Sequence, residues 1–485
     1  MSGSRPPGRE SFYVQNVIEG ASIPGGTSLD FGRITTSVVP ITQLDLTTLN
    51  IFDHAEPLGL AAGYDQGGKL IALAISDPNT CKIIDVSSIS KSKARHTSDE
   101  ALHFLEDKVL CRSAGELFAF DAGPITVSIY TSLRLRITGL VDIQTAFLEK
   151  DQDRAPLASV LEIMGSDGAV YEDNVKELFN EPVYDPEDKN CRIDLATRAW
   201  LAAFLPTYSN GAMMLDGVAR IDTKKKGEYE LDMITKLGTD AHRQDYLSPM
   251  QTEHKFTARS DENGRIQARA DIYKTKFHAN RDVQVTVENA RGKFSIYGTV
   301  EGTVGRTGSI KVDHHITSEA VTTVTSIGHE GPTRADRDKA QLILHALQDK
   351  VSLGSKNPWV QNIWFPDGQG MSWPEDWDPN PADLPLPPPS EGGNQARYNP
   401  SQLKAVEAML SSSTNNSIVL IQGPPGTGKT SVIANYVLRA TEAGQKGIWL
   451  IAQSNVAVKN IAEKLMSIGF EKWRLLVSKD FHYEW

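Results

Sequence analysis

Cysteine and long apolar runs are both scarce in this chain of 485 residues. Cys81, Cys111 and Cys191 stand far apart, which is neither a disulfide framework nor a zinc-ligand spacing, so we expect reduced, buried side chains. No apolar run reaches the ~18–20 residues that would span a bilayer, and residues 1–16 lack the apolar core of a signal peptide. We therefore expect a soluble intracellular protein, cytoplasmic or nuclear, with no membrane partner.

An overall surplus of positive charge is also lacking, because the formal net charge is −11. A uniformly acidic chain would disfavour a nucleic-acid partner. The charge is uneven, however, since residues 254–311 hold 11 Lys+Arg against 6 Asp+Glu. This local basic stretch is compatible with binding to a phosphate backbone, and a solvated face without a partner is the alternative.

The pattern along the chain predicts an α/β multidomain protein. Residues 1–35 are polar and rich in Gly and Pro, which predicts a disordered tail. Residues 36–214 alternate strand and helix patterns, and residues 215–335 hold short runs rich in Val, Ile and Thr, punctuated by Gly and Asn, as in a small β-barrel. Residues 336–397 predict a helix and a Pro-rich linker. Residues 398–485 predict strand, loop, helix, strand and helix, an α/β unit with a parallel sheet.

The most specific motif is GPPGTGKT, which fits G-x-x-x-x-G-K-[ST] and lies between a predicted buried strand and a predicted helix. Its glycines permit turns that aim consecutive N–H groups into one nest, and the helix N-terminus adds partial positive charge. We predict an ATP–Mg²⁺ site in which Lys429 reaches the β- and γ-phosphates and the Thr430 hydroxyl holds Mg²⁺. A Gly-rich strand–helix turn without a ligand is the alternative. The expected nucleotide-binding residues of this loop are Gly423, Pro424, Pro425, Gly426, Thr427, Gly428, Lys429, Thr430 and Ser431.

Two flanking stretches narrow the class of protein. YNPSQLKAVEAML precedes the loop, and AQSNVAVKNIAEKL follows it. With the loop they resemble the first RecA-like domain of superfamily 1 helicases, in the branch of the nonsense-mediated-decay RNA helicase and its senataxin-like relatives. The resemblance covers residues 398–478 and implies a P-loop domain that binds ATP and single-stranded nucleic acid, with RNA favoured over DNA.

The same resemblance assigns roles to individual residues outside the loop. It makes Gln402 the residue that hydrogen-bonds adenine, and a Gln amide does offer the donor and the acceptor that adenine needs. It places Ser454 and Asn455 against the nucleic-acid backbone, at a helix N-terminus. An exposed helix residue and a plain helix cap are the respective alternatives. Lys459 stands where relatives often carry an acid.

Part of a helicase motor is missing from the residues that follow Thr430. Hydrolysis needs an acidic Walker B pair and arginine fingers from a second RecA-like domain, and no DExx motif on an apolar strand occurs there. We expect the RecA-like domain to be truncated at its C-terminus. The partner would then be a C-terminal helicase half, which a separate gene could encode.

Two upstream stretches complete the expectations. In the β-rich block, Lys274, Lys276, Arg291 and Lys293 are candidate nucleic-acid contacts, because cations beside aromatic residues form single-strand platforms; surface and core residues of an ordinary barrel are the alternative. Residues 36–214 weakly resemble a 3′–5′ exonuclease of the ribonuclease D type, with a ribonuclease H-like fold. That family holds two metal ions with four carboxylates, whereas the matching place here reads AAG at residues 61–63.

The exonuclease resemblance therefore implies a degenerate site. Asp142 keeps an acid at a family-like position, and Asp65 and Asp121 are the other candidates for a rearranged metal site. We favour a helicase-type ATPase that binds ATP and Mg²⁺. The alternative is a non-enzymatic nucleic-acid-binding scaffold with a vestigial nucleotide site.

Overall fold

The computed structural model describes most of the chain in two compact units. Unit 1 combines residues 1–248 with residues 330–365, and the remainder of the chain forms unit 2. The described residues are 10–18, 33–49, 52, 55–87, 95–146, 156–165, 170–180, 183–208, 210–246, 251–260, 265–271, 277, 281–289, 292–304, 306–312, 321–327, 334–353, 358–364, 398–411 and 418–477.

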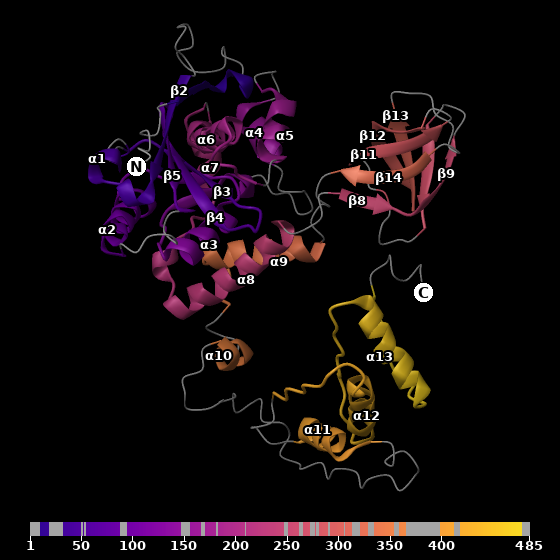
Figure 1. Ribbon diagram of the computed structural model, residues 1–485. Helices are drawn as coiled ribbons and strands as arrows, with labels where there is room; N and C mark the ends of the chain where they lie inside the picture. Colours follow the sequence, from indigo (N-terminus) through magenta and orange to yellow (C-terminus); the bar gives the residue numbers. More distant parts are fainter. Residues whose placement is uncertain are drawn as a thin grey trace, which may run out of the picture. The chain divides into compact units, whose positions relative to one another are not determined.

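A mixed sheet forms the centre of unit 1 (Figure 1). The strands β3, β4 and β5 form an antiparallel meander, and β6 and β7 extend it in parallel beside β3. On the far side, β2 runs parallel to β5 and β1 pairs with β2. In spatial order the strands are β1 (Glu10–Tyr13), β2 (Arg33–Pro40), β5 (Thr80–Asp85), β4 (Leu70–Ser76), β3 (Leu58–Tyr64), β6 (Leu117–Ala119) and β7 (Leu140–Asp142).

Helices cover both faces of this sheet, so its central strands are apolar on both sides. Every residue of β3 is buried. On one face α6 approaches β3 so closely that a Cβ at Gly59 would lie 1.8 Å from the carbonyl oxygen of Ala199. On the other face α3, α8 and α9 contribute to the second core. The helices of unit 1 are α1 (Leu46–Leu49), α2 (Arg95–Leu105), α3 (Ala122–Leu133), α4 (Pro156–Met164), α5 (Glu172–Asn180), α6 (Lys189–Phe204), α7 (Gly211–Asp216), α8 (Glu228–Tyr246), α9 (Arg334–Leu347) and α10 (Pro358–Trp364).

The structure differs from two expected segment boundaries. Part of the expected disordered tail is ordered, because β1 pairs with β2 and Val14 and Ile18 are fully buried. The apolar side chains of residues 11–18 explain this order, which the Gly- and Pro-rich composition of the whole segment conceals. The expected barrel start at residue 215 is too early, since α8 belongs to unit 1 and the first barrel strand begins at Gln251.

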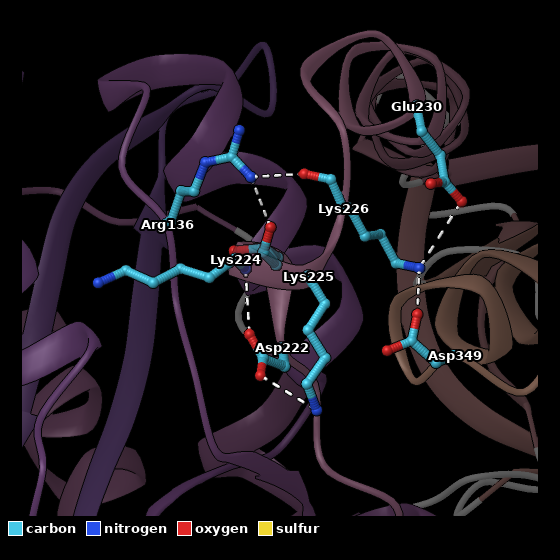
Figure 2. A network of polar contacts seen from close by, with 8 residues as sticks. Arg136, Asp222, Lys224, Lys225, Lys226, Glu230 and Asp349 are labelled. Atoms are coloured by element: carbon cyan, nitrogen blue, oxygen red, sulfur yellow. Dashed lines mark hydrogen bonds and ion pairs between the residues drawn. The ribbon is translucent and has the colours of Figure 1, made fainter.

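An ion pair between a buried lysine and a half-exposed aspartate joins the start of α8 to the end of α9 (Figure 2). The Lys226 side chain is only 3% exposed, and its Nζ lies 2.6 Å from Asp349 Oδ1 and 3.7 Å from Glu230 Oε1. Arg136 Nη1 donates to the carbonyl oxygens of Thr223 and Lys226, which fixes the backbone that carries the lysine. The two helices pack together, so this contact makes them an antiparallel pair.

An antiparallel sheet of unit 2 lies in sequence between α8 and α9. Its strands, in spatial order, are β8 (Gln251–His254), β14 (Val321–Ile327), β11 (Arg281–Asn289), β12 (Gly292–Val304), β13 (Thr307–Val312), β10 (Ile266–Ala270) and β9 (Phe256–Ser260). The two edge strands, β8 and β9, are separated by a single residue of the chain. The sheet must therefore curl until its edges nearly meet, around a core that includes Val285, Val300 and Ile310. This near-barrel matches the fold class expected for this block.

The C-terminal segment of unit 2 contains α11 (Pro400–Leu410), α12 (Lys429–Glu442) and α13 (Asn455–Ser467). The expected parallel sheet is not formed in its described residues, because residues 418–424 and 447–453 belong to no strand. Large apolar side chains there face solvent: Leu420 is 93% exposed, Ile451 87% and Trp449 75%. A parallel strand needs neighbours for its backbone hydrogen bonds and for both of its faces, and the described residues supply none.

The expectations based on the few cysteines and on the lack of long apolar runs can be compared directly with the structure. The three cysteines are free thiols, but full burial holds only for Cys81. Burial raises the pKa of the Cys81 thiol to about 12, so this side chain acts as a small apolar core residue. Within the described ranges, no helix combines the length and the apolar character needed to cross a membrane.

Candidate nucleotide-binding site

The GPPGTGKT loop runs directly into the N-terminus of α12. Gly426 and Gly428 both have a φ of +81°, a left-handed conformation that favours glycine. Lys429 is the first residue of the helix and Thr430 the second. The N–H groups of a first helical turn have no partner within the helix, so the loop and the helix together present donors to an anion.

The Lys429 ammonium group is held by its own loop. Its Nζ donates to the carbonyl oxygens of Gly423 and Pro424, at 2.6 and 2.9 Å. The Thr427 hydroxyl donates to the same Pro424 oxygen, at 2.9 Å. These bonds hold the ammonium group against the start of the loop, and Lys429 is exposed to solvent. Pro425 and Ser431 lie in the same turn and in the first helical turn, respectively.

Gln402 connects α11 with the loop. Asn399 caps α11, and its side chain accepts the Gln402 N–H, while Gln402 Oε1 accepts the Asn399 N–H, each at 2.9 Å. The same amide donates from Nε2 to the carbonyl oxygen of Thr427, also at 2.9 Å. The structure thus brings the predicted adenine-binding residue into contact with the predicted phosphate loop. Sequence reasoning missed Asn399, although N-x-x-Q before an apolar run is a capping-box pattern.

Ser454 and Asn455 lie at the N-terminus of α13. The Ser454 hydroxyl caps this helix by accepting the Ala457 N–H, at 3.2 Å. Lys459, one turn further on, pairs with Glu463 at 3.5 Å. The helix cap that the alternative expects is therefore present.

The structure places only part of the expected basic platform on the near-barrel. Lys293 lies on β12 and pairs with Glu288 on β11, at 3.4 Å. Its neighbour Phe294 is partly exposed. The candidates Lys274, Lys276 and Arg291 lie outside the described residues. Two other described cations of this sheet, Arg265 and Lys311, pair with Glu301.

An aromatic side chain lies beside residues 61–63, where the exonuclease resemblance leads us to expect a degenerate site. A Cβ at Gly63 would lie 2.8 Å from Tyr184 Cγ, so the tyrosine ring occupies the space that a longer side chain at this position would need. Ala61 lies in the same apolar core as Tyr184. In the part of the chain that the structure describes, no group of three His, Cys, Asp or Glu residues could hold a metal ion.

The three aspartates considered for a rearranged metal site have separate structural roles. Asp65 accepts the Gly67 and Lys69 N–H groups in the β3–β4 turn. Asp142 is fully buried and accepts the Gln144 N–H. Asp121 starts α3 with a φ of +53°. The hypothesis of a rearranged metal site is therefore wrong for these residues.

Comparison with known proteins shows what the C-terminal segment is similar to. Residues 397–479 match a family model described as an AAA domain. The putative ATP-dependent RNA helicase ECM32 of Saccharomyces cerevisiae is 48% identical over 71 residues, 14% of this chain and 6% of that protein. The ATP-dependent helicase NAM7 of the same yeast is 41% identical over 93 residues, 19% of this chain and 9% of that protein. The regulator of nonsense transcripts 1 homolog of Arabidopsis thaliana is 44% identical over 77 residues, 16% of this chain and 6% of that protein.

A comparison with solved structures gives a second kind of similarity. The ribonuclease D of Trypanosoma brucei, solved with GMP, aligns over 43% of this chain and 64% of its own, at 15% identity and a TM-score of 0.27. A TM-score of this size assigns no fold. The chain spans less than a tenth of the length of the three helicase-like relatives. Its C-terminal segment is thus similar to an AAA domain family and to ATP-dependent helicases, among them a regulator of nonsense transcripts.

Proposed function

We propose that residues 398–477 bind ATP with Mg²⁺ as part of a helicase-type ATPase that acts on nucleic acid. The observation that carries this proposal is the loop before α12, where two left-handed glycines precede Lys429 and Thr430 at the helix N-terminus. Backbone N–H groups, the positive end of the helix dipole and one ammonium group thus lie close together. Because all three attract negative charge, this arrangement suits a triphosphate.

Each residue of the site has a separate role in this proposal. Lys429 would exchange the carbonyl oxygens of Gly423 and Pro424 for the β- and γ-phosphates, because charged oxygens are stronger acceptors. The Thr430 hydroxyl would hold Mg²⁺, which neutralises developing charge on the phosphates when bound. A single hydroxyl and phosphate oxygens suit an ion that keeps several of its waters.

The exposed apolar residues of 418–424 and 447–453 support a second proposal, which concerns how the parallel sheet is completed. Leu420, Trp449 and Ile451 are typical of strands buried in a parallel sheet, yet they face solvent. We propose that strands from elsewhere complete this sheet and bring the Walker B acids. A separately encoded helicase half is one source of those strands.

The proposed nucleic-acid ligand is a single strand, with RNA favoured. The named relatives include an RNA helicase, and the α13 N-terminus at Ser454 and Asn455 offers backbone donors to a phosphate. Unit 1 would serve as a non-catalytic domain. An antiparallel meander extended by two parallel strands supports a ribonuclease H-like fold for this unit. Tyr184 fills the space beside Gly63.

Fluorescent ATP-analogue binding tests the proposal. The analogue with Mg²⁺ is titrated into the chain, into Lys429→Ala and into the exposed-lysine control Lys446→Ala, each with and without single-stranded RNA. We expect binding by the chain and by the control, loss in Lys429→Ala, and a change in affinity when RNA is present. Equal binding by all three proteins would show that the loop is not the site, and absence of binding in all three would favour the scaffold alternative.

A further inference from the structure

The outer surface of the near-barrel carries a row of polar and cationic side chains. Successive residues of a strand point to opposite faces of a sheet, and Ile266, Ala268 and Ala270 of β10 are fully buried in the core. The residues that alternate with them therefore point outward. We define the basic face as the outward positions on and directly before β9, β10 and β13. They are Lys255, Thr257, Arg265, Gln267, Arg269, Thr307, Ser309 and Lys311.

Positive charge predominates on the basic face, because its eight positions hold four cations and no acid. Glu301 on β12 pairs with two of the cations, since its carboxylate lies 3.0 Å from Arg265 Nε and 3.8 Å from Lys311 Nζ. Arg269 is exposed, and the strand register places a threonine on each side of it. Asp271 directly follows β10 and adds a second flanking carboxylate. The face therefore suits a ligand of moderate negative charge.

The uncharged positions of the basic face narrow the class of ligand to a peptide. They carry hydroxyl groups and one amide, and Gln267 Nε2 donates to Ser309 Oγ at 3.1 Å. Such groups can bond to the N–H and C=O groups of a peptide backbone. None of the eight positions is aromatic, whereas single-stranded nucleic acid is typically held by aromatic side chains on which bases stack. An acidic peptide fits both the cations and the neutral positions.

The chain contains an acidic peptide of this kind. We call residues 365–396 the acidic segment, because they hold six Asp and Glu residues and no Lys or Arg. The segment also contains Trp373 and Trp377, and a tryptophan ring attracts a guanidinium group through its π-face. It lies outside the described residues, and its composition complements the two arginines and two lysines of the basic face.

Chain connectivity allows the acidic segment to reach the near-barrel. After β14 the chain enters α9, whose 14 residues span about 21 Å, and the acidic segment begins directly after α10. A flexible chain of its length has a root-mean-square end-to-end distance of about 30 Å. It can therefore extend back over the length of α9. Tethered ligands of this kind have effective concentrations on the order of 1 mM, so weak contacts suffice.

We propose that the acidic segment docks on the basic face of the near-barrel. Its carboxylates pair with the four cations of the face, and its tryptophan rings stack on guanidinium groups. Arg269 is the central contact, because it is exposed and lies between uncharged neighbours. The inference does not depend on nucleotide binding, since it involves no residue of the GPPGTGKT loop.

Binding of a labelled peptide tests the proposal by fluorescence anisotropy. The peptide has the sequence of residues 365–396 and is titrated into the full chain and into a full chain with a neutralised segment. The neutralised segment carries Glu375→Gln, Asp376→Asn, Asp378→Asn and Asp383→Asn. The unchanged chain should bind the peptide about tenfold more weakly, because a tethered competitor at ~1 mM opposes a dissociation constant of about 0.1 mM. Raising the salt concentration should weaken binding to the neutralised chain.

Charge reversal on the face identifies the residues that bind. Arg269→Glu, added to the neutralised chain, should weaken peptide binding at least fivefold. Lys293→Glu is the matched control, because Lys293 is an exposed cation of the same sheet that lies outside the basic face and pairs with Glu288. It should leave peptide binding unchanged. A peptide that carries Lys in place of Asp376 and Asp378 should regain affinity for Arg269→Glu, which a misfolded sheet could not provide.

The remaining outcomes would overturn the proposal. Equal peptide binding by the unchanged and the neutralised chains would show that the tethered segment does not occupy the face. Equal losses in Arg269→Glu and Lys293→Glu would show that the peptide responds only to the overall charge. Single-stranded RNA that binds the neutralised chain through Arg269 and is not displaced by the peptide would assign the face to nucleic acid. None of these results affects the proposed function, because no nucleotide is present in the experiment.

Discussion

His242 shows how the structure changes the chemistry of a single residue. It is mostly buried and its ring lies 4.4 Å from that of Tyr64, between centroids. Burial, with a smaller effect from the positive charge of Arg243, lowers the pKa of His242 to about 4. The neutral imidazole is therefore the form that the folded protein favours.

This lowered pKa predicts a pH dependence of stability. The unfolded chain takes up a proton at His242 near its ordinary value of 6.5, whereas the folded protein remains neutral until about pH 4. Lowering the pH from 7 to 4 should therefore favour unfolding, by about 3 kcal/mol from this residue. Urea unfolding of the chain and of His242→Phe at pH 7 and pH 5 measures it; the variant should lose less stability on acidification, and identical losses would contradict the prediction.

Gly428 gives a second prediction at this scale. Its φ of +81° is unfavourable for other residues, and a Cβ at this position would lie only 2.8 Å from Gln402 Nε2. Gly428→Ala should reduce ATP-analogue affinity at least tenfold and destabilise the C-terminal segment by about 1–2 kcal/mol. Gly444→Ala is the control, because that glycine has a φ of +84° but no neighbour within 4 Å of a Cβ. It should lower stability without changing affinity.

The residues of the loop could be predicted from the sequence because eight consecutive positions form one motif. The aromatic side chain beside Gly63 could not be, since Tyr184 is distant in sequence and no pattern links the two. Absence of a carboxylate at residues 61–63 predicts a degenerate metal site, but only packing shows what fills it.

At the scale of elements, the local sequence pattern predicts a helix or strand correctly where the element's own residues stabilise it. The capping box starts α11 where the N-x-x-Q pattern stands, and the alternating runs of residues 281–304 form β11 and β12. The predicted strand before the loop is not formed among the described residues, because apolar composition cannot show which neighbours pair with it. The stretch LVDIQT has helical periodicity but forms β7 and a 3₁₀ turn, since β6 supplies a parallel partner.

The ion pair at the base of α8 and α9 predicts a strongly coupled pair of mutations. Asp349→Asn should destabilise unit 1 by about 2 kcal/mol, because it leaves the buried Lys226 ammonium with only the more distant Glu230. Asparagine tolerates the positive φ of residue 349, so backbone strain does not add to the loss. Adding Lys226→Met to Asp349→Asn should recover at least half of it. Urea unfolding of the four proteins of this cycle measures the coupling, and additive losses would contradict it.

The order of the units in the chain was only partly predictable from the sequence. The near-barrel could be recognised from its rhythm of short strands. Its placement as an insertion could not, because nothing in the sequence of α9 shows that it packs against α8, almost ninety residues earlier. Domain boundaries drawn from composition therefore divided unit 1 at residue 214.

At the scale of the whole molecule, the insertion predicts that unit 1 folds without the near-barrel. In the antiparallel pair, the C-terminal end of α8 and the N-terminal end of α9 lie at the same end of the two helices (Figure 1). Replacing residues 249–329 by a flexible Gly/Ser linker should shift the thermal midpoint of unit 1 by no more than about 4 °C. Differential scanning calorimetry measures this shift, and loss of the unit 1 transition would contradict it.

The position of α9 also determines the order in which the protein can assemble during synthesis. Asp349 leaves the ribosome only after the entire near-barrel has emerged, so the contact between Lys226 and Asp349 cannot close before then. The inserted sheet can form first, because its core in the described residues comes only from residues 256–324. Until α9 is synthesised, nascent unit 1 exposes the Lys226 side chain, which is buried in the complete fold, and the apolar helix face that α9 later covers. This stage of synthesis is therefore the one at which a chaperone would be needed most.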